Sequence, residues 1–168
     1  MSLSMYQASI PPLLRMLGNF KAILEKGVAH EAAKKLDAGV LPNCRLYPDM
    51  FPLRSQVFIA TDMAKSCPAR LSGTEPVSFE DTEQTLAELI TRVEKTIALL
   101  KTFKPEQIDG SEERDVTLKT PRGSVNFKGQ QYLQHFLLPN FYFHVTTAYD
   151  ILRHNGVELG KFDYLGSN

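Results

Sequence analysis

The feature that most constrains the fold of this chain is an apolar pattern that recurs in four separate stretches. In each of them, apolar residues follow one another at steps of mostly four and three positions. That spacing places their side chains along one face of an α-helix. A helix must cover such a face, so the pattern predicts helices that pack against one another. The first stretch carries the pattern on Tyr6, Ile10, Leu13, Leu17, Phe20 and Leu24.

The first helix is expected to end at Gly27, with a short helical piece to follow at about 30–36. The other three helices are expected at about 51–72, 79–103 and 129–155. Their apolar faces consist of Leu53, Val57, Ala60, Ala64, Cys67 and Leu71, then Leu86, Leu89, Ile90, Val93, Ile97 and Leu100, and finally Leu133, Leu137, Phe141, Ala148, Ile151 and Leu152.

Local features add detail to the third and fourth helices. Ser78 with Asp81 resembles a capping box at the start of the third helix. Glu88 and Arg92 are predicted to form an exposed ion pair of small energetic weight, because they lie four residues apart. Pro139 lacks a backbone N–H, so we expect it to kink or break the fourth helix.

Between the third and fourth helices the pattern changes from helical spacing to alternation. Residues 114–120 and 124–128 alternate apolar with polar side chains, and Pro121, Arg122 and Gly123 between them suit a turn. This indicates a short β-hairpin. The predicted fold is therefore all-α: a four-helix bundle formed by residues 1–168 as one domain, with a β-hairpin insertion between helices three and four.

Composition narrows the range of functions. Lys and Arg together number 19, as do Asp and Glu, so the formal net charge is zero and we expect no nucleic-acid or membrane partner. The two cysteines, Cys44 and Cys67, lack the spacing of a metal site, and isolated thiols suit a reducing cytoplasm. Since no signal-peptide pattern or membrane-spanning stretch is found, we expect a cytoplasmic protein.

The segment 136–156 carries the sharpest hint of function. Its apolar face includes two polar side chains, Asn140 and His144, which lie four residues apart. Buried polar groups need partners, and a pair at this spacing could hold a metal or a polar ligand inside a bundle. Gln56 also points toward the core and is expected to partner one of them across the helix interface. His144 could instead be a satisfied core histidine, which is the more common role of a lone histidine on an apolar face. Asn140 could orient His144 or bind a ligand, or it could satisfy carbonyl oxygens freed by Pro139.

Two further residues complete the candidate site. Tyr142, with Tyr6 and Tyr47, could line a pocket with its polar tip, although aromatic residues at helical spacing are more often core or interface residues. Asp49 precedes the second helix and is predicted to be its N-cap. The alternative is that Asp49 supplies a carboxylate to the site, which requires its loop to fold over that end of the bundle.

Three strings of residues point to a known group of proteins. They are residues 4–11 (SMYQASIP), 47–53 (YPDMFPL) and 138–157 (LPNFYFHVTTAYDILRHNGV). In these strings the chain resembles the DinB/YfiT-like superfamily of bacterial-type, metal-dependent four-helix bundles. More closely, it resembles an uncharacterised branch described as a domain of unknown function. Because the strings touch both ends and the middle, the resemblance covers essentially the whole chain.

The resemblance implies a place for a metal. Members of the superfamily typically bind a divalent metal through one histidine of the second helix and an HxxxH pair of the fourth. The second histidine of that pair matches His144, the first falls at Asn140, and the second-helix ligand falls near Gln56. Only one of the three positions therefore holds histidine here.

Two functional hypotheses follow. In the first, the bundle keeps the superfamily pocket in altered form and binds a small ligand or a weakly held divalent metal (Ni or Zn) near Gln56, Asn140 and His144. If such a protein is an enzyme, the resemblance implies that the ion activates a thiol or water. In the second, the metal site has been lost, and the protein is a non-enzymatic homodimer with a structural or interaction role.

Overall fold

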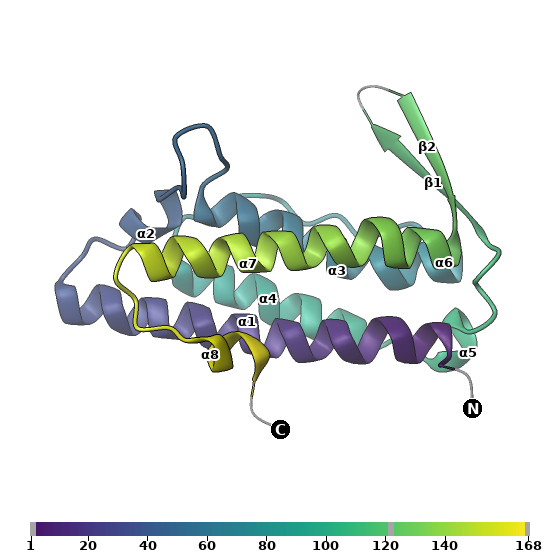
Figure 1. The fold of residues 1–168 in the computed structure, drawn as a ribbon, viewed down its shortest axis with the longest axis horizontal. Coiled ribbons are helices and arrows are strands. Elements are labelled where there is room, and N and C mark those ends of the chain that lie inside the picture. The colour runs from purple at the N-terminus through teal and green to yellow at the C-terminus, as the bar shows by residue number, and fades with distance from the viewer. Residues whose placement is uncertain (1–2, 121–122, 167–168) are drawn as a thin grey trace.

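The computed structural model describes residues 3–120 and 123–166 (Figure 1). Its elements, in chain order, are α1 (Met5–Lys34), α2 (Val40–Asn43), α3 (Leu53–Ser72), α4 (Leu86–Leu100), α5 (Pro105–Ile108), β1 (Asp115–Thr120), β2 (Gly123–Lys128), α6 (Gly129–Gln131), the π-helical turn η1 (Tyr132–Leu137), α7 (Leu138–His154) and α8 (Lys161–Leu165).

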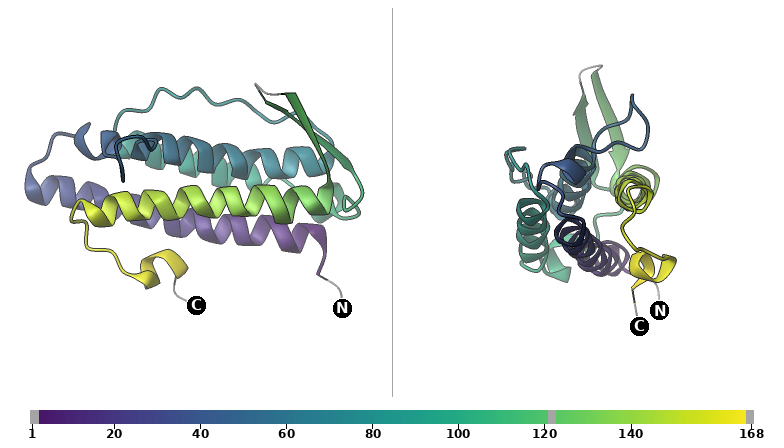
Figure 2. Two further views of the ribbon diagram at one scale, coloured as in Figure 1. Left: turned by 45° about the horizontal axis from the view of Figure 1, so that its top comes forward. Right: turned by 90° about the vertical axis from the view of Figure 1, so that its left-hand side faces the viewer.

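The long helices α1, α3, α4 and α7 lie side by side, and this confirms the predicted four-helix bundle with a β-hairpin insertion (Figures 1 and 2). The most extensive helix contacts join α3 with α7, α1 with α4, and α3 with α4. The connection 74–85 runs back along the length of the bundle before α4 begins (Figure 2). As a result α3 and α4 point in the same direction, and α1 and α7 run the opposite way.

The apolar faces predicted from spacing meet in the centre of the bundle, where Leu17, Phe20 and Phe141 are fully buried. The expected end of the first helix at Gly27 is wrong, because α1 continues to Lys34. Gly27 serves close packing instead. A Cβ atom there would lie 2.9 Å from Leu86 Cδ1 and 3.3 Å from Leu152 Cδ2, so a larger residue would force these leucine side chains to shift.

The helix α4 begins later than predicted. Its capping box is formed by Thr85 and Glu88 rather than by Ser78 and Asp81: Thr85 Oγ1 accepts from the Glu88 N–H, and the Glu88 carboxylate accepts from the Thr85 N–H. Glu88 is thereby engaged at the helix start. The predicted exposed pair of Glu88 with Arg92 is wrong for the same reason.

Arg92 is in fact 1% exposed and fastens the connection 74–85 to the bundle. Its Nε donates to Thr61 Oγ1 (2.8 Å). Its Nη1 donates to the Glu80 carbonyl (2.8 Å) and to the Glu83 carboxylate (3.3 Å), and its Nη2 donates to Asp62 (3.1 Å) and Asp81 (2.9 Å). The guanidinium also lies 4.8 Å from the centre of the Phe58 ring and 5.5 Å from that of Phe79. These residues are called the Arg92 cluster below.

The chain stays helical through Pro139, where a kink or break was expected. Just before it, the wide turn η1 lets the Leu138 N–H donate to the Leu133 carbonyl, five residues earlier. Pro139 therefore falls at the start of α7, where a missing N–H costs little. α6, η1 and α7 form one continuous rod (Figure 1).

The β-hairpin pairs β1 and β2 in antiparallel fashion, with Val116 opposite Phe127 and Leu118 opposite Val125. Val116 and Leu118 are buried against the bundle, as the alternation predicted. Gly123 begins β2, and the other two residues of the predicted turn, Pro121 and Arg122, lie outside the described residues.

The C-terminal segment docks on the bundle through α8, which packs on α1. Tyr164 is the anchor: its hydroxyl accepts from Thr146 Oγ1 (3.0 Å), and its carbonyl accepts from Asn19 Nδ2 (2.9 Å). Phe162, by contrast, is exposed. Within residues 3–120 and 123–166, none of the helices combines the length and apolar character needed to cross a membrane.

Candidate functional site

Two of the predicted site residues meet between α3 and α7. His144 Nδ1 lies 2.7 Å from Gln56 Oε1. Gln56 is in the first turn of α3 and is 2% exposed, whereas His144 is half-buried on α7. The structure thus contains the contact across the helix interface that the sequence predicts. It lies at the end of the bundle that carries the connection 44–52, since that connection leads directly into α3.

A second hydrogen bond of Gln56 determines which nitrogen of the His144 ring carries the hydrogen. Gln56 Nε2 donates to the Phe51 carbonyl (3.0 Å), so Oε1 is the amide atom that faces His144. An amide oxygen only accepts hydrogen bonds, and therefore His144 Nδ1 carries the hydrogen. The lone pair of the neutral imidazole is then on Nε2.

The environment keeps this imidazole neutral. Partial burial lowers the pKa of His144 below its usual value, because the surrounding protein solvates imidazolium less well than water does. Nε2 makes no hydrogen bond to any described residue, and it is not among the sealed polar atoms that lack a partner. It is consequently open to solvent and free to accept a proton or a hydrogen bond.

Asn140 lies one helical turn before His144 but bonds elsewhere. Its Nδ2 donates to the Phe136 carbonyl (2.6 Å), which is four residues earlier in the same rod. The amide therefore does not orient the His144 ring. Its Oδ1 makes no hydrogen bond to the described residues and is the group that Asn140 can offer to a ligand.

The structure does not bring Tyr142 and Asp49 to His144. Tyr142 is half-buried against the Phe141 ring, with Tyr164 as an electrostatic neighbour, and burial raises the pKa of its hydroxyl. Asp49 is exposed in the connection 44–52, which rises away from the helices (Figure 1). It is not the predicted N-cap, because α3 begins after Pro52 and has no side-chain cap.

The residues present do not fit the three-histidine metal set of the superfamily. Gln56 Oε1 is taken by Nδ1, on the opposite edge of the ring from the free Nε2, so Gln56 cannot ligate an ion bound at Nε2. In the part of the chain that the structure describes, no three His, Cys, Asp or Glu side chains lie close enough together to hold a metal ion. What the site offers instead is one imidazole nitrogen and one amide oxygen.

Exposed aromatic side chains near the site were missed from the sequence. Phe143, next to His144 in the chain, is 57% exposed, and its ring meets the imidazole edge-on at 5.2 Å. Phe51, whose carbonyl binds Gln56, is 60% exposed. Neither residue belongs to the predicted apolar face of its helix. An aromatic residue outside such a face is the sequence feature that could have pointed to these exposed side chains.

Comparison with known proteins gives the chain its relatives. A crystal structure of a DinB family member protein from Shewanella denitrificans is 40% identical in sequence, with a TM-score of 0.88 over 97% of this chain and 92% of that one. A search of curated proteins found no match. Residues 5–165 match the family described as "Domain of unknown function (DUF1993)". The chain belongs to this family and has the DinB fold.

Proposed function

We propose that this protein binds a small molecule through His144, at the open side of the α3–α7 interface. The observation that supports the proposal most directly is the 2.7 Å contact of Gln56 with Nδ1, which holds the ring and leaves the lone pair on Nε2. A neutral, solvent-open imidazole can accept a hydrogen bond from a hydroxyl or thiol, or remove its proton as a general base. Phe143 offers an apolar surface beside it.

A divalent cation is expected to bind this site only weakly. His144 Nε2 and Asn140 Oδ1 belong to residues on one face of α7, but an amide oxygen is a poor donor for Ni²⁺ or Zn²⁺. Such an ion would be held mainly by one imidazole, with water as its remaining ligands. Asp49 could contribute a carboxylate only if the connection 44–52 moved. We therefore expect metal affinity to be low and binding of the small molecule to be metal-independent.

The test is thermal unfolding of chelator-treated protein with a panel of small alcohols and thiols, and separately with Ni²⁺, Zn²⁺ and Mn²⁺. A compound that binds only the native state raises the unfolding temperature. We expect members of the organic panel to stabilise wild type but not His144→Ala. His154→Ala is the matched control, because His154 is an exposed histidine of the same helix.

Two outcomes would contradict the proposal. In one, no panel member stabilises wild type. In the other, His144→Ala responds as strongly as His154→Ala, which would place binding elsewhere. A large metal-dependent rise in the unfolding temperature that His144→Ala abolishes would overturn the expectation of metal-independent binding. It would indicate instead that His144 ligates a metal.

A second candidate function is self-association without catalysis. It is supported by the exposed aromatic side chains Phe51, Phe143 and Tyr47, the last of which is 65% exposed. A formal net charge of zero does not oppose contact between copies. In this alternative the Gln56–His144 bond only fixes how α3 and α7 pack. The aromatic side chains would lie in a homodimer interface.

Sedimentation equilibrium separates the two candidates. A homodimer that Phe143→Ser converts to monomer, with His144→Ala still dimeric, would favour the interaction role. Phe162→Ser is the control, since Phe162 is also exposed (82%, against 57% for Phe143) but lies on α8. A monomeric wild-type protein at all concentrations would contradict the homodimer.

A further inference from the structure

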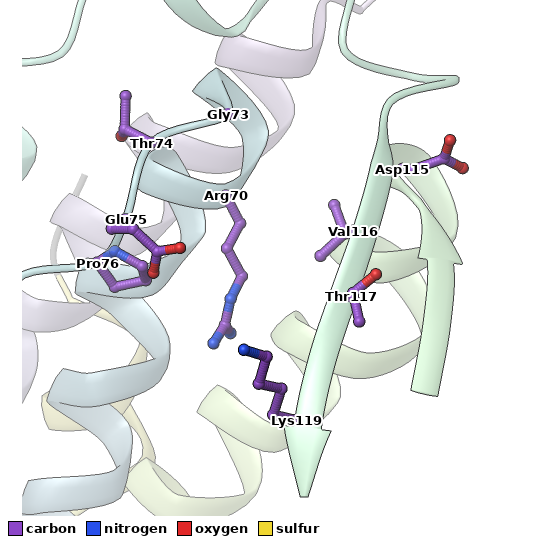
Figure 3. A pocket seen from close by; sticks show the side chains of 9 residues that line it. All are labelled: Arg70, Gly73, Thr74, Glu75, Pro76, Asp115, Val116, Thr117 and Lys119. Atoms are coloured by element: carbon purple, nitrogen blue, oxygen red, sulfur yellow. The ribbon is translucent and has the colours of Figure 1, made fainter. Parts of the chain in front are cut away.

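A second pocket lies far from His144, at the opposite end of α3. It has a volume of about 300 Å³ and is bounded by the end of α3, residues 73–76 and strand β1. Figure 3 shows its lining, with side chains from α3 on one side and from β1 on the other. The volume is at the lower end of the range for small-molecule sites.

Two cationic side chains enter this pocket from opposite walls. Arg70 extends from α3 and Lys119 from β1, and their charged ends point toward one another (Figure 3). Like charges repel, so a negative charge between the two side chains would stabilise this arrangement. Within the described residues, no carboxylate oxygen lies within 4.0 Å of either cation.

Arg70 is held in place by an aromatic residue rather than by an acid. Its Nη1 donates to the Tyr132 hydroxyl (3.4 Å), and its guanidinium lies 5.9 Å from the centre of the Tyr132 ring. Tyr132 is fully buried, so it provides a rigid support. The guanidinium is thus positioned, yet its charge has no acidic partner.

A third cation borders the pocket. Gly73, which lines it, adopts a φ of +79°, and a Cβ atom at this glycine would lie 2.5 Å from Arg114 Nη1. The Arg114 guanidinium therefore packs against the backbone of the pocket rim. It adds a third positive charge beside Gly73, next to the two cations that line the pocket.

The acidic side chains at the pocket do not cancel this charge. Asp115 is paired with Lys128 at 2.7 Å and points away from the pocket (Figure 3). That leaves Glu75 as the unpaired acid of the lining, against Arg70 and Lys119 in the lining and Arg114 beside Gly73. Positive charge is therefore in excess here, which favours an anion.

The end of α3 does not explain the cations by itself. Helix C-termini attract positive charge because their last carbonyls lack partners. Here the Ala69 carbonyl accepts from the Thr74 N–H and from Ser72 Oγ, and the Arg70 carbonyl accepts from the Gly73 N–H. Arg70 and Lys119 are thus not required to satisfy these carbonyls.

From these observations we propose that the pocket between α3 and β1 binds a small phosphate-bearing anion. The planar fork of Arg70 suits two phosphate oxygens, and Lys119 and Arg114 add charge around the third. The hydroxyls of Thr74 and Thr117 are already engaged with Ala69 and Asn126, so recognition rests on the three cations. This site is independent of the one proposed at His144.

The experiment is calorimetric titration of the whole chain with phenyl phosphate and with inorganic phosphate, at fixed ionic strength. Succinate, a dianion without phosphorus, is titrated in parallel. We expect saturable binding of both phosphates, with weaker binding of succinate. Lys119→Gln should lower the phosphate affinity about tenfold, the usual effect of one charged hydrogen bond. Lys95→Gln is the control, because Lys95 is exposed on α4 and makes no described contact.

Backbone amide NMR supplies a second readout that does not depend on stability. Phosphate should shift the amide signals of Gly73, Thr74 and Thr117 in wild type and in Lys95→Gln. Arg70→Gln should abolish the shifts while the spectrum stays that of a folded protein. The proposal is overturned by absence of saturable phosphate binding, by equal losses in Lys119→Gln and Lys95→Gln, or by succinate binding as tightly as phosphate.

Discussion

Arg92 and His144 are both polar side chains within the bundle, but they differ in how completely their bonding capacity is used. Arg92 has five N–H donors, and it faces five acceptors: Thr61, the Glu80 carbonyl, and the carboxylates of Glu83, Asp62 and Asp81. His144 uses one ring nitrogen on Gln56 and leaves the other open. A polar side chain whose donors and acceptors are all used within the protein can only stabilise the fold. A side chain that keeps a free, accessible donor or acceptor can also bind a ligand.

The comparison also concerns solvent. Arg92 is 1% exposed, and the two aromatic rings of the Arg92 cluster cover it. His144 is half-buried beside the exposed Phe143. At Arg92, hydrogen bonds and ion pairs compensate for the loss of water around the charged group. At His144, partial burial instead lowers the pKa, so the ring stays neutral and can accept a hydrogen bond or a proton.

The largest expected effect comes from Arg92→Met. It removes every bond of the cluster and releases the connection 74–85, so we expect the free energy of unfolding to fall by about 3 kcal/mol. Urea unfolding monitored by circular dichroism measures it. Arg54→Met is the matched control, because Arg54 also reaches that connection, through Gln84, from a half-buried position. We expect the control to lose less than about 1 kcal/mol of unfolding free energy. If Arg92→Met lost equally little, Arg92 would not differ from a surface arginine in its contribution to stability.

A smaller effect is expected at the α3–α7 interface. His144→Ala and Gln56→Leu should each lower the free energy of unfolding by about 1–2 kcal/mol, since each removes one hydrogen bond. The double variant should lose less than the sum of the single losses, because both changes break the same bond. Strict additivity in this double-mutant cycle would mean that the 2.7 Å contact contributes no stability of its own.

The pH dependence of stability sharpens the comparison further. Because the pKa of His144 is lowered in the folded state, the unfolded chain binds the proton more readily. The contribution of His144 is therefore fully present above the unfolded value of about 6.5 and is lost as pH falls through the folded pKa. Unfolding of wild type and His144→Gln between neutral and mildly acidic pH should converge toward the acid end. His154→Gln, at an exposed histidine of the same helix, is the control.

The smallest effect is expected for Asp49→Ala. The carboxylate is exposed and makes no described bond, so the free energy of unfolding should stay within about 0.5 kcal/mol of wild type. Binding of the organic panel to His144 should be unchanged too. A clear loss of either would show that the connection 44–52 closes over the site in solution.

The bundle itself was predictable because helical spacing reports directly on which face is buried. The same spacing misled at Arg92: Glu88, four residues earlier, is an obvious partner, whereas the true partners come from α3 and from a connection that folds back. Gln56 and His144 could be paired from sequence because both interrupt apolar faces. Their bonding pattern could not, since the acceptor role of Gln56 depends on the Phe51 carbonyl. Gly27 was misjudged because close packing and a helix end favour the same residue.

The shared direction of α3 and α4 shapes how the chain can fold. In an up-and-down bundle each helix forms a local hairpin with the next. Here the most extensive contacts join α3 with α7 and α1 with α4, which are distant in sequence. Large loops must close before those contacts form, and this raises the contact order and slows folding relative to a simple helical hairpin array. A nascent chain that lacks α7 would leave α3 without its main partner, so we expect stable structure only after nearly the whole chain has been synthesised.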